Sequence, residues 1–92
     1  MKATAAKDEI VSQVNTTANL VCFVTPYDKG NPDSYFFIWT RQGDATFHHN
    51  TSFGVFQLTP SSPDDEDTYK CAPENSIGQG LPADIMLWIL GK

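Results

Sequence analysis

The sequence predicts an all-β domain built as a sandwich of two antiparallel sheets. Segments in which apolar and polar residues alternate recur along its 92 residues, and clusters of proline, glycine, asparagine and serine separate them. In the clearest segment, Ala18, Leu20, Cys22 and Val24 fall on one side of the chain. An alternation of this kind indicates a strand with one buried face, and such strands need a second sheet to cover them.

A second set of residues indicates which sandwich this is. One cysteine, Cys22, lies early in the chain, Trp39 lies near the middle, and Tyr69 precedes a late cysteine, Cys71, by two positions. The motif Asp-x-Asp-x-Tyr-x-Cys, which begins at Asp65, resembles the corner between strands E and F of the immunoglobulin superfamily. The resemblance extends over almost the whole chain.

The resemblance implies structural roles for these residues. In the family, a disulfide joins the two sheets, a tryptophan packs beside it, and the tyrosine hydroxyl bonds to the backbone at the corner. We therefore expect a disulfide between Cys22 and Cys71. The alternative is a pair of buried, reduced thiols, as in a cytosolic protein. The core signature residues are Trp39, Tyr69, Asp65 and Leu58.

The alternating segments match the strands of an immunoglobulin-like two-sheet antiparallel β-sandwich. The expected strands are A (10–14), B (18–24), C (35–40), a short strand (45–49), E (55–59), F (68–74) and G (82–90). Strands A, B and E, with D where it exists, should form one sheet, and strands C, F and G the other. The Asn75-x-x-Gly78 hairpin resembles the one found in intermediate-set (I-set) domains.

The length allows a single domain. Residues 1–9 are small, polar and charged, so we expect them to be flexible, with Met1 and a few others introduced for expression. Residues 10–92 should form the domain. The chain has neither the apolar middle of a signal peptide nor a run long enough to span a membrane. We therefore expect it to be a piece of a longer protein.

The charge pattern excludes two classes of partner. The net charge is −5, and the six lysine and arginine residues are scattered along the chain. Nucleic acids and anionic membranes both require clustered basic residues. We expect neither as a partner.

The sequence shows no motif for catalysis, a phosphate-binding loop or a cofactor. His48 and His49 are adjacent, so on a strand they point to opposite faces and cannot chelate one metal ion together. The acidic run 64–67 lacks the alternating oxygens and glycine of an EF-hand and should instead cap the corner loop. We expect no enzyme activity, no cofactor, no metal and no small-molecule substrate.

Two N-glycosylation sequons are present, at Asn15 and at Asn50. Both fall in predicted turns, where a glycan can be carried without steric conflict. Together with the expected disulfide, they favour a secreted or cell-surface protein.

The most informative feature for function is an excess of large apolar residues on the C-F-G sheet. If Phe37 and Trp39 face the core, Phe36 and Ile38 face outward. Exposed apolar patches of this kind mark contact surfaces, unless a tail, a linker or a neighbouring domain covers them.

Strand G has two possible registers. Either Ile85, Leu87 and Ile89 point inward, or the row containing Met86 and Trp88 does. Alignment from the F–G hairpin favours the second register, whereas a bulge would produce the first. The residues expected to contact a partner are Phe36, Ile38, Tyr27 in the long B–C loop, Lys70, Glu74, Met86 and Trp88.

The resemblance implies a protein-binding module from the ectodomain of a cell-surface adhesion molecule or receptor. Its partner would be a protein, bound homophilically or heterophilically, and its parent would be anchored in the membrane outside this segment. The alternative is a spacer domain of an intracellular muscle or cytoskeletal protein, whose cysteines would be reduced.

Overall fold

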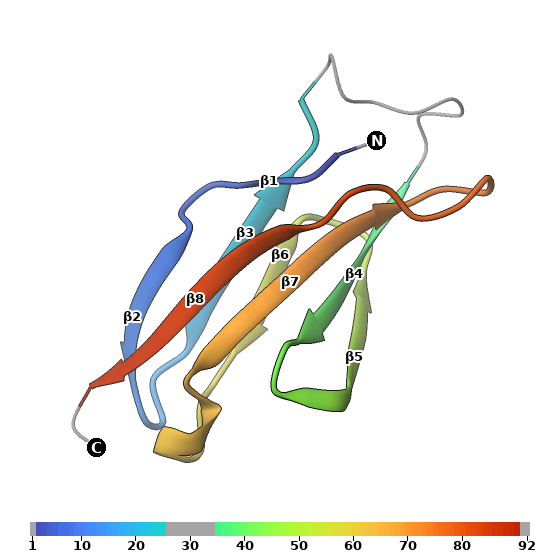
Figure 1. The fold of residues 1–92 in the computed structure, drawn as a ribbon. Coiled ribbons are helices and arrows are strands. Elements are labelled where there is room, and N and C mark those ends of the chain that lie inside the picture. The colour runs from blue at the N-terminus through green and yellow to red at the C-terminus, as the bar shows by residue number, and fades with distance from the viewer. Residues whose placement is uncertain (1, 26–34, 91–92) are drawn as a thin grey trace.

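The computed structural model describes residues 2–25 and 35–90, whose strands form two packed sheets (Figure 1). One sheet has the order β1-β3-β6, and the other has the order β2-β8-β7-β4-β5. No helix within these residues has the length and apolar composition needed to cross a membrane. The strands are β1 (Thr4–Ala5), β2 (Glu9–Gln13), β3 (Ala18–Phe23), β4 (Phe36–Arg41), β5 (Asp44–Thr51), β6 (Val55–Leu58), β7 (Asp67–Glu74) and β8 (Ala83–Leu90). The predicted all-β, two-sheet fold is confirmed.

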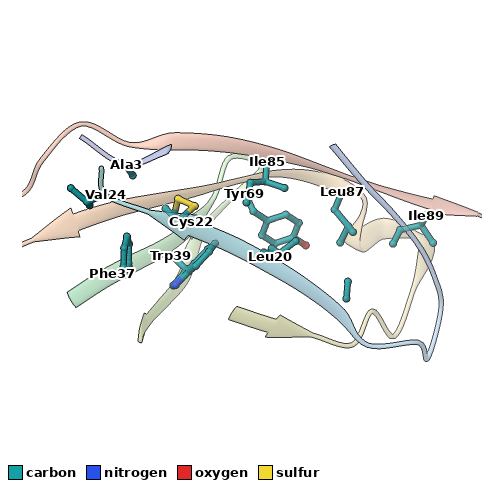
Figure 2. Packing of buried hydrophobic residues seen from close by; sticks show 12 residues of the cluster. Ala3, Leu20, Cys22, Val24, Phe37, Trp39, Tyr69, Ile85, Leu87 and Ile89 are labelled. Carbon is teal, nitrogen blue, oxygen red and sulfur yellow. A yellow bond between two sulfur atoms is a disulfide. The ribbon is translucent and has the colours of Figure 1, made fainter. Parts of the chain in front are cut away.

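The core lies between the sheets and follows from the alternation within each strand. Figure 2 shows Ile85, Leu87 and Ile89 of β8 pointing inward on the side of Leu20 and Tyr69. Each of these five side chains is at most 3% exposed.

The disulfide between Cys22 of β3 and Cys71 of β7 joins the two sheets across this core (Figure 2). Trp39 lies in β4 directly opposite Cys71 and is fully buried. Its indole stacks on Phe56 of β6, with ring centroids 5.5 Å apart, and its Nε1–H donates to Thr51 Oγ1 at 2.8 Å. The indole therefore fills apolar space between the sheets while its polar atom is satisfied.

The corner before β7 is closed by hydrogen bonds to the backbone. A single 3-10 turn, η2 (Pro63–Asp65), is capped by Ser62, and the Asp65 carboxylate accepts from the backbone N–H of Ser61 at 2.9 Å. The buried Tyr69 hydroxyl donates to the Asp65 carbonyl at 2.7 Å. Leu58 ends β6 and is partly buried against the core.

Residues 2–9, which were expected to be flexible, are joined to the rest of the fold by strand pairing. β1 pairs with β3, Ala3 is 2% exposed, and its N–H donates to the Leu81 carbonyl at 2.9 Å. The chain then crosses to the other sheet, where β2 pairs with β8 in parallel. The predicted strand A (10–14) therefore lies beside strand G and not, as expected, in the sheet of strands B and E. The small and polar side chains of this segment look like a loose terminus in the sequence, because the strands with which they pair are distant in the chain.

The strand between C and E also differs from the expectation. β5 is longer than residues 45–49 and pairs with β4, so it extends the sheet of strands C, F and G rather than lying beside strand E as a strand D. The reason is the short turn at Gln42 and Gly43, because a two-residue connection returns the chain next to the strand it left.

The register of β8 is the opposite of the one favoured by alignment. Tyr69 pairs with Ile85 and Cys71 with Ala83, so the inward row of β7 determines the inward row of β8. Trp88, which the favoured register placed in the core, is 42% exposed. Pairing with a neighbour that carries the disulfide decides the register, and the hairpin sequence alone does not contain that information.

We expect Trp39→Ala to lower the free energy of unfolding by about 3–5 kcal/mol, because it leaves a large cavity between the sheets. Chemical denaturation measures this change. Trp88→Ala is the matched control, since it removes the same side chain from the surface and should cost less than about 1 kcal/mol. A smaller loss for Trp39→Ala than for Trp88→Ala would contradict the assigned core.

Candidate binding face

The candidate site is the outer face of the five-stranded sheet, formed by the side chains that alternate with the buried ones on β2, β8, β7, β4 and β5. Burial along β2 and β8 shows the alternation clearly. Val11 is 59% exposed, whereas its neighbour Ser12 is buried, and Trp88 is exposed between buried Leu87 and Ile89. One side of the sheet therefore faces the core, and the other faces away from it.

An exposed apolar cluster lies where β2 meets β8. Val11 is directly opposite Trp88, and Leu90 follows two residues later on the same side. Trp88 is 42% exposed and Leu90 is 54% exposed, while Met86 is partly buried. These four residues form what we call the edge patch. The Trp88 Nε1–H donates to Glu9 Oε1 at 3.1 Å, which orients the indole on the surface.

A polar strip borders the edge patch. Lys70 of β7 donates to Asp84 of β8 at 2.9 Å, and both side chains are exposed. An exposed ion pair of this kind contributes little to stability.

A second apolar cluster, the central patch, comprises Phe36 and Ile38 of β4 with Ala72 of β7. Ile38 lies opposite Ala72, and Phe36 lies opposite Glu74. The expectation that Ile38 is exposed is wrong, because only 9% of it is accessible. β4 has a paired strand on each side, and their side chains close over Ile38 even though it points away from the core. Phe36 and Glu74 are half-buried.

The structure thus brings Phe36, Ile38, Lys70 and Glu74 together on one part of the face and places Met86 and Trp88 on another. Tyr27 lies outside the described residues. The assignment of these residues to a partner contact stays a prediction.

The two sequons occupy different environments. Asn15 is exposed in the turn between β2 and β3 with φ 65°, a left-handed conformation that asparagine tolerates well. Asn50 was expected in a turn but lies within β5, where it is exposed and directly opposite Ile38. Asn50 therefore belongs to the outer face.

No protein-family model and no curated protein matches the chain. Among solved structures, the N-terminal four immunoglobulin domains of Dscam1 isoform 9.44 are similar with a TM-score of 0.63 and 16% identity. The match covers 96% of this chain and 20% of that one, so the chain spans a fifth of that neighbour's length. The complex of titin M10 with an obscurin-like 1 immunoglobulin domain is similar with a TM-score of 0.57 and 18% identity, over 96% of this chain and 93% of that one.

The chain has the immunoglobulin-like fold. At 16% and 18% identity, the similarity to these two structures concerns the fold alone.

At the corner of this immunoglobulin-like domain, Arg41 and the backbone of Gly43 hold the Asp67 carboxylate. Arg41 Nε donates to Asp67 Oδ2 at 2.9 Å, and Arg41 Nη1 donates to Asp65 Oδ1 at 3.2 Å. The Gly43 N–H also donates to Asp67 Oδ2 at 2.9 Å. A Cβ atom at position 43 would overlap with that oxygen, so the carboxylate requires glycine there.

Electrostatics at this corner follow from the same contacts. Partial burial acts to raise the pKa of Asp67, but hydrogen bonds from Arg41 and from backbone N–H groups outweigh it, so the pKa lies below its usual value. The Arg41 guanidinium also lies over the Tyr69 ring, 5.8 Å from its centroid. Burial of Tyr69 raises the pKa of its hydroxyl to about 12, although the charge of Arg41 opposes the shift.

Glu66 and His49 also have structural contacts. Glu66 Oε1 accepts from the Ile89 N–H at 2.9 Å, and His49 packs against Phe47 with ring centroids 4.7 Å apart. His48 lies opposite Thr40 on the outer face. Within residues 2–25 and 35–90, no three histidine, cysteine, aspartate or glutamate side chains are placed to hold a metal ion.

Sequence reasoning missed two members of the candidate site, Val11 and Glu9, and named Leu90 only as part of the outward row in one register of strand G. Their alternation with Ile10, Ser12 and Ile89 was present in the sequence as a signal for a strand. The sequence did not show that Val11 and Glu9 lie beside β8, because this depends on the parallel pairing of β2 with β8.

We expect stability to fall as the pH rises from about 10 to about 12. Tyr69 ionises near 10.0 when unfolded but near 12 when folded, so the folded state disfavours the tyrosinate. The contribution is intact below pH 10 and declines by about 1.4 kcal/mol per pH unit between the two pKa values. Urea unfolding at each pH measures this change.

The control is Tyr69→Phe, which keeps the ring and removes the titrating group. Its stability should vary less over this pH range, after the constant loss of the hydrogen bond to Asp65. Parallel curves for the two proteins would show that Tyr69 does not cause the alkaline destabilisation.

Proposed function

We propose that this chain is an I-set-like, protein-binding immunoglobulin module from the ectodomain of a cell-surface adhesion molecule or receptor. It would recognise a protein partner through the outer face of the five-stranded sheet and the adjoining loops. The observation that carries the proposal is the edge patch, in which exposed Val11, Trp88 and Leu90 lie side by side.

The composition of the edge patch supports a protein contact. Interface centres are enriched in aromatic residues and methionine and poor in charge, and this patch contains Trp88 and Met86. Its border contains Glu9 and the Lys70–Asp84 ion pair, which resembles the polar rim of an interface. A rigid sheet presents these side chains at little entropic cost on binding.

Three observations support an extracellular location. The chain carries the Cys22–Cys71 disulfide, which is typical of oxidising compartments. Both sequon asparagines are exposed. The fold is also similar to that of Dscam1 domains.

A second candidate is a spacer domain of an intracellular muscle or cytoskeletal protein. The observation that favours it is the similarity to the titin M10 complex. In that case the two cysteines would be reduced in the native protein, and the edge patch would be covered by a neighbouring domain.

To test the binding face, we would multimerise the chain and measure its binding to an array of cell-surface ectodomains that includes the chain itself. Val11→Asp should weaken binding about tenfold or more, because a charge is forced into a desolvated contact. Val55→Asp is the matched control, since Val55 is 43% exposed on the other sheet and should not alter binding. Thermal unfolding verifies that both variants fold.

Equal binding by the Val11→Asp variant and the unchanged chain would contradict this face. Binding to none of the ectodomains would also contradict the proposed function.

The state of the cysteines separates the two candidates. We expect the chain, isolated from its native source and unfolded without reductant, to show no thiol that reacts with a maleimide. Two reactive thiols per chain would instead favour the spacer. Reduction before labelling is the control, and it should yield two thiols in either case.

A further inference from the structure

Asn50 stands at one edge of the outer face, beside the central patch. It pairs with Ile38, whose neighbours Phe37 and Trp39 point into the core, so Asn50 and Ile38 share the outer side. β5 is the last strand of its sheet, and Asn50 is exposed. A large substituent on Asn50 therefore has room beyond the edge and an apolar surface beside it.

We propose that Asn50 carries an N-linked glycan whose first N-acetylglucosamine units lie over the central patch of Phe36, Ile38 and Ala72. The chain's own carbohydrate then covers this half of the face, and protein contact is confined to the edge patch. This inference rests on the proposed function in one respect, namely passage through the secretory pathway.

The geometry suits a glycan that lies back on the sheet. Neighbouring strands are about 4.8 Å apart, so a disaccharide that begins on β5 passes over β4 and reaches β7. There it meets Ile38, which is 9% exposed, Ala72, which is 4% exposed, and the half-buried ring of Phe36. The C–H groups of a pyranose ring and the N-acetyl methyl group pack favourably on apolar side chains and on the negative face of an aromatic ring.

The attachment is a balanced transfer from a lipid diphosphate-linked oligosaccharide. The Asn50 amide nitrogen bonds to the anomeric carbon of the sugar, and the bond between that carbon and the diphosphate oxygen breaks. The amide loses one proton, and the lipid diphosphate leaves. No oxidation or reduction takes place.

The second sequon provides an internal contrast. Asn15 lies in the turn between β2 and β3, and its backbone N–H donates to the Pro60 carbonyl at 2.7 Å. This turn joins the two sheets, and a glycan there would extend from the end of the sandwich. It would not lie over the central patch.

The first measurement is occupancy, on chain secreted from eukaryotic cells. Trypsin releases Asn15 within residues 8–29 and Asn50 within residues 42–70, so mass spectrometry reads each sequon separately. Ser52→Ala removes the Asn50 sequon without altering the asparagine. Asn15→Gly removes the other sequon and keeps a residue that tolerates its positive φ. An unmodified Asn50 in the secreted chain overturns the proposal.

The second measurement is the solvent accessibility of the central patch, determined by hydroxyl-radical labelling of the glycosylated chain and of the two variants. Phe36 should be labelled severalfold faster after Ser52→Ala, and no faster after Asn15→Gly. Trp88, on the same face but in the edge patch, should be labelled at one rate in all three proteins. Equal labelling of Phe36 with and without the Asn50 glycan overturns the proposal.

The two proposals fail separately. If Asn50 carries no glycan, the binding test with Val11→Asp is unaffected, because that test measures the contribution of the edge patch. Conversely, Val11→Asp can bind normally while Phe36 is still shielded, which would reject the edge patch as the contact and leave the covered central patch in place.

Discussion

The disulfide between Cys22 and Cys71 is the constraint on which the arrangement of both sheets depends. It closes a separation of 49 residues, which the chain-entropy model values at about 4 kcal/mol, a large contribution for a domain of this size. It also specifies which side of β3 and which side of β7 face inward. Trp39 lies opposite Cys71, so the largest core side chain packs where the sheets are tied together.

The outer face follows from that inward choice. β7 lies between β4 and β8 and is paired with both. Because residues that are directly opposite each other in paired strands point to the same side of the sheet, the inward residues of β7 determine which residues of β4 and β8 point inward. Once Tyr69 and Cys71 face the core, Ile85 must do so as well, and Trp88 is left outside. Core packing therefore decides which positions face outward and form the candidate interaction surface. It does not constrain which residues occupy those positions.

The two apolar regions of the face differ in physical character. In the edge patch, Val11 lies on the border strand β2 and Trp88 on the adjacent strand β8, and both keep much of their surface exposed. In the central patch, Ile38 is closed in by strands on both sides. The same alternation therefore produces an open contact surface where β2 meets β8 and a nearly buried one where β4 meets β7.

The sequence by itself determined the all-β class, the cysteine pair that ties the sheets, and the inward direction of Phe37 and Trp39, since period-two patterns and motif spacing are local properties. Only the tertiary structure decided the register of β8, the burial of Ile38, the place of β5 beside β4 and the packing of residues 2–9. These depend on which strand lies next to which, and that choice is made by pairing between distant segments. The position of Asn50 opposite Ile38 is likewise a product of strand pairing, because twelve positions of chain separate the two residues.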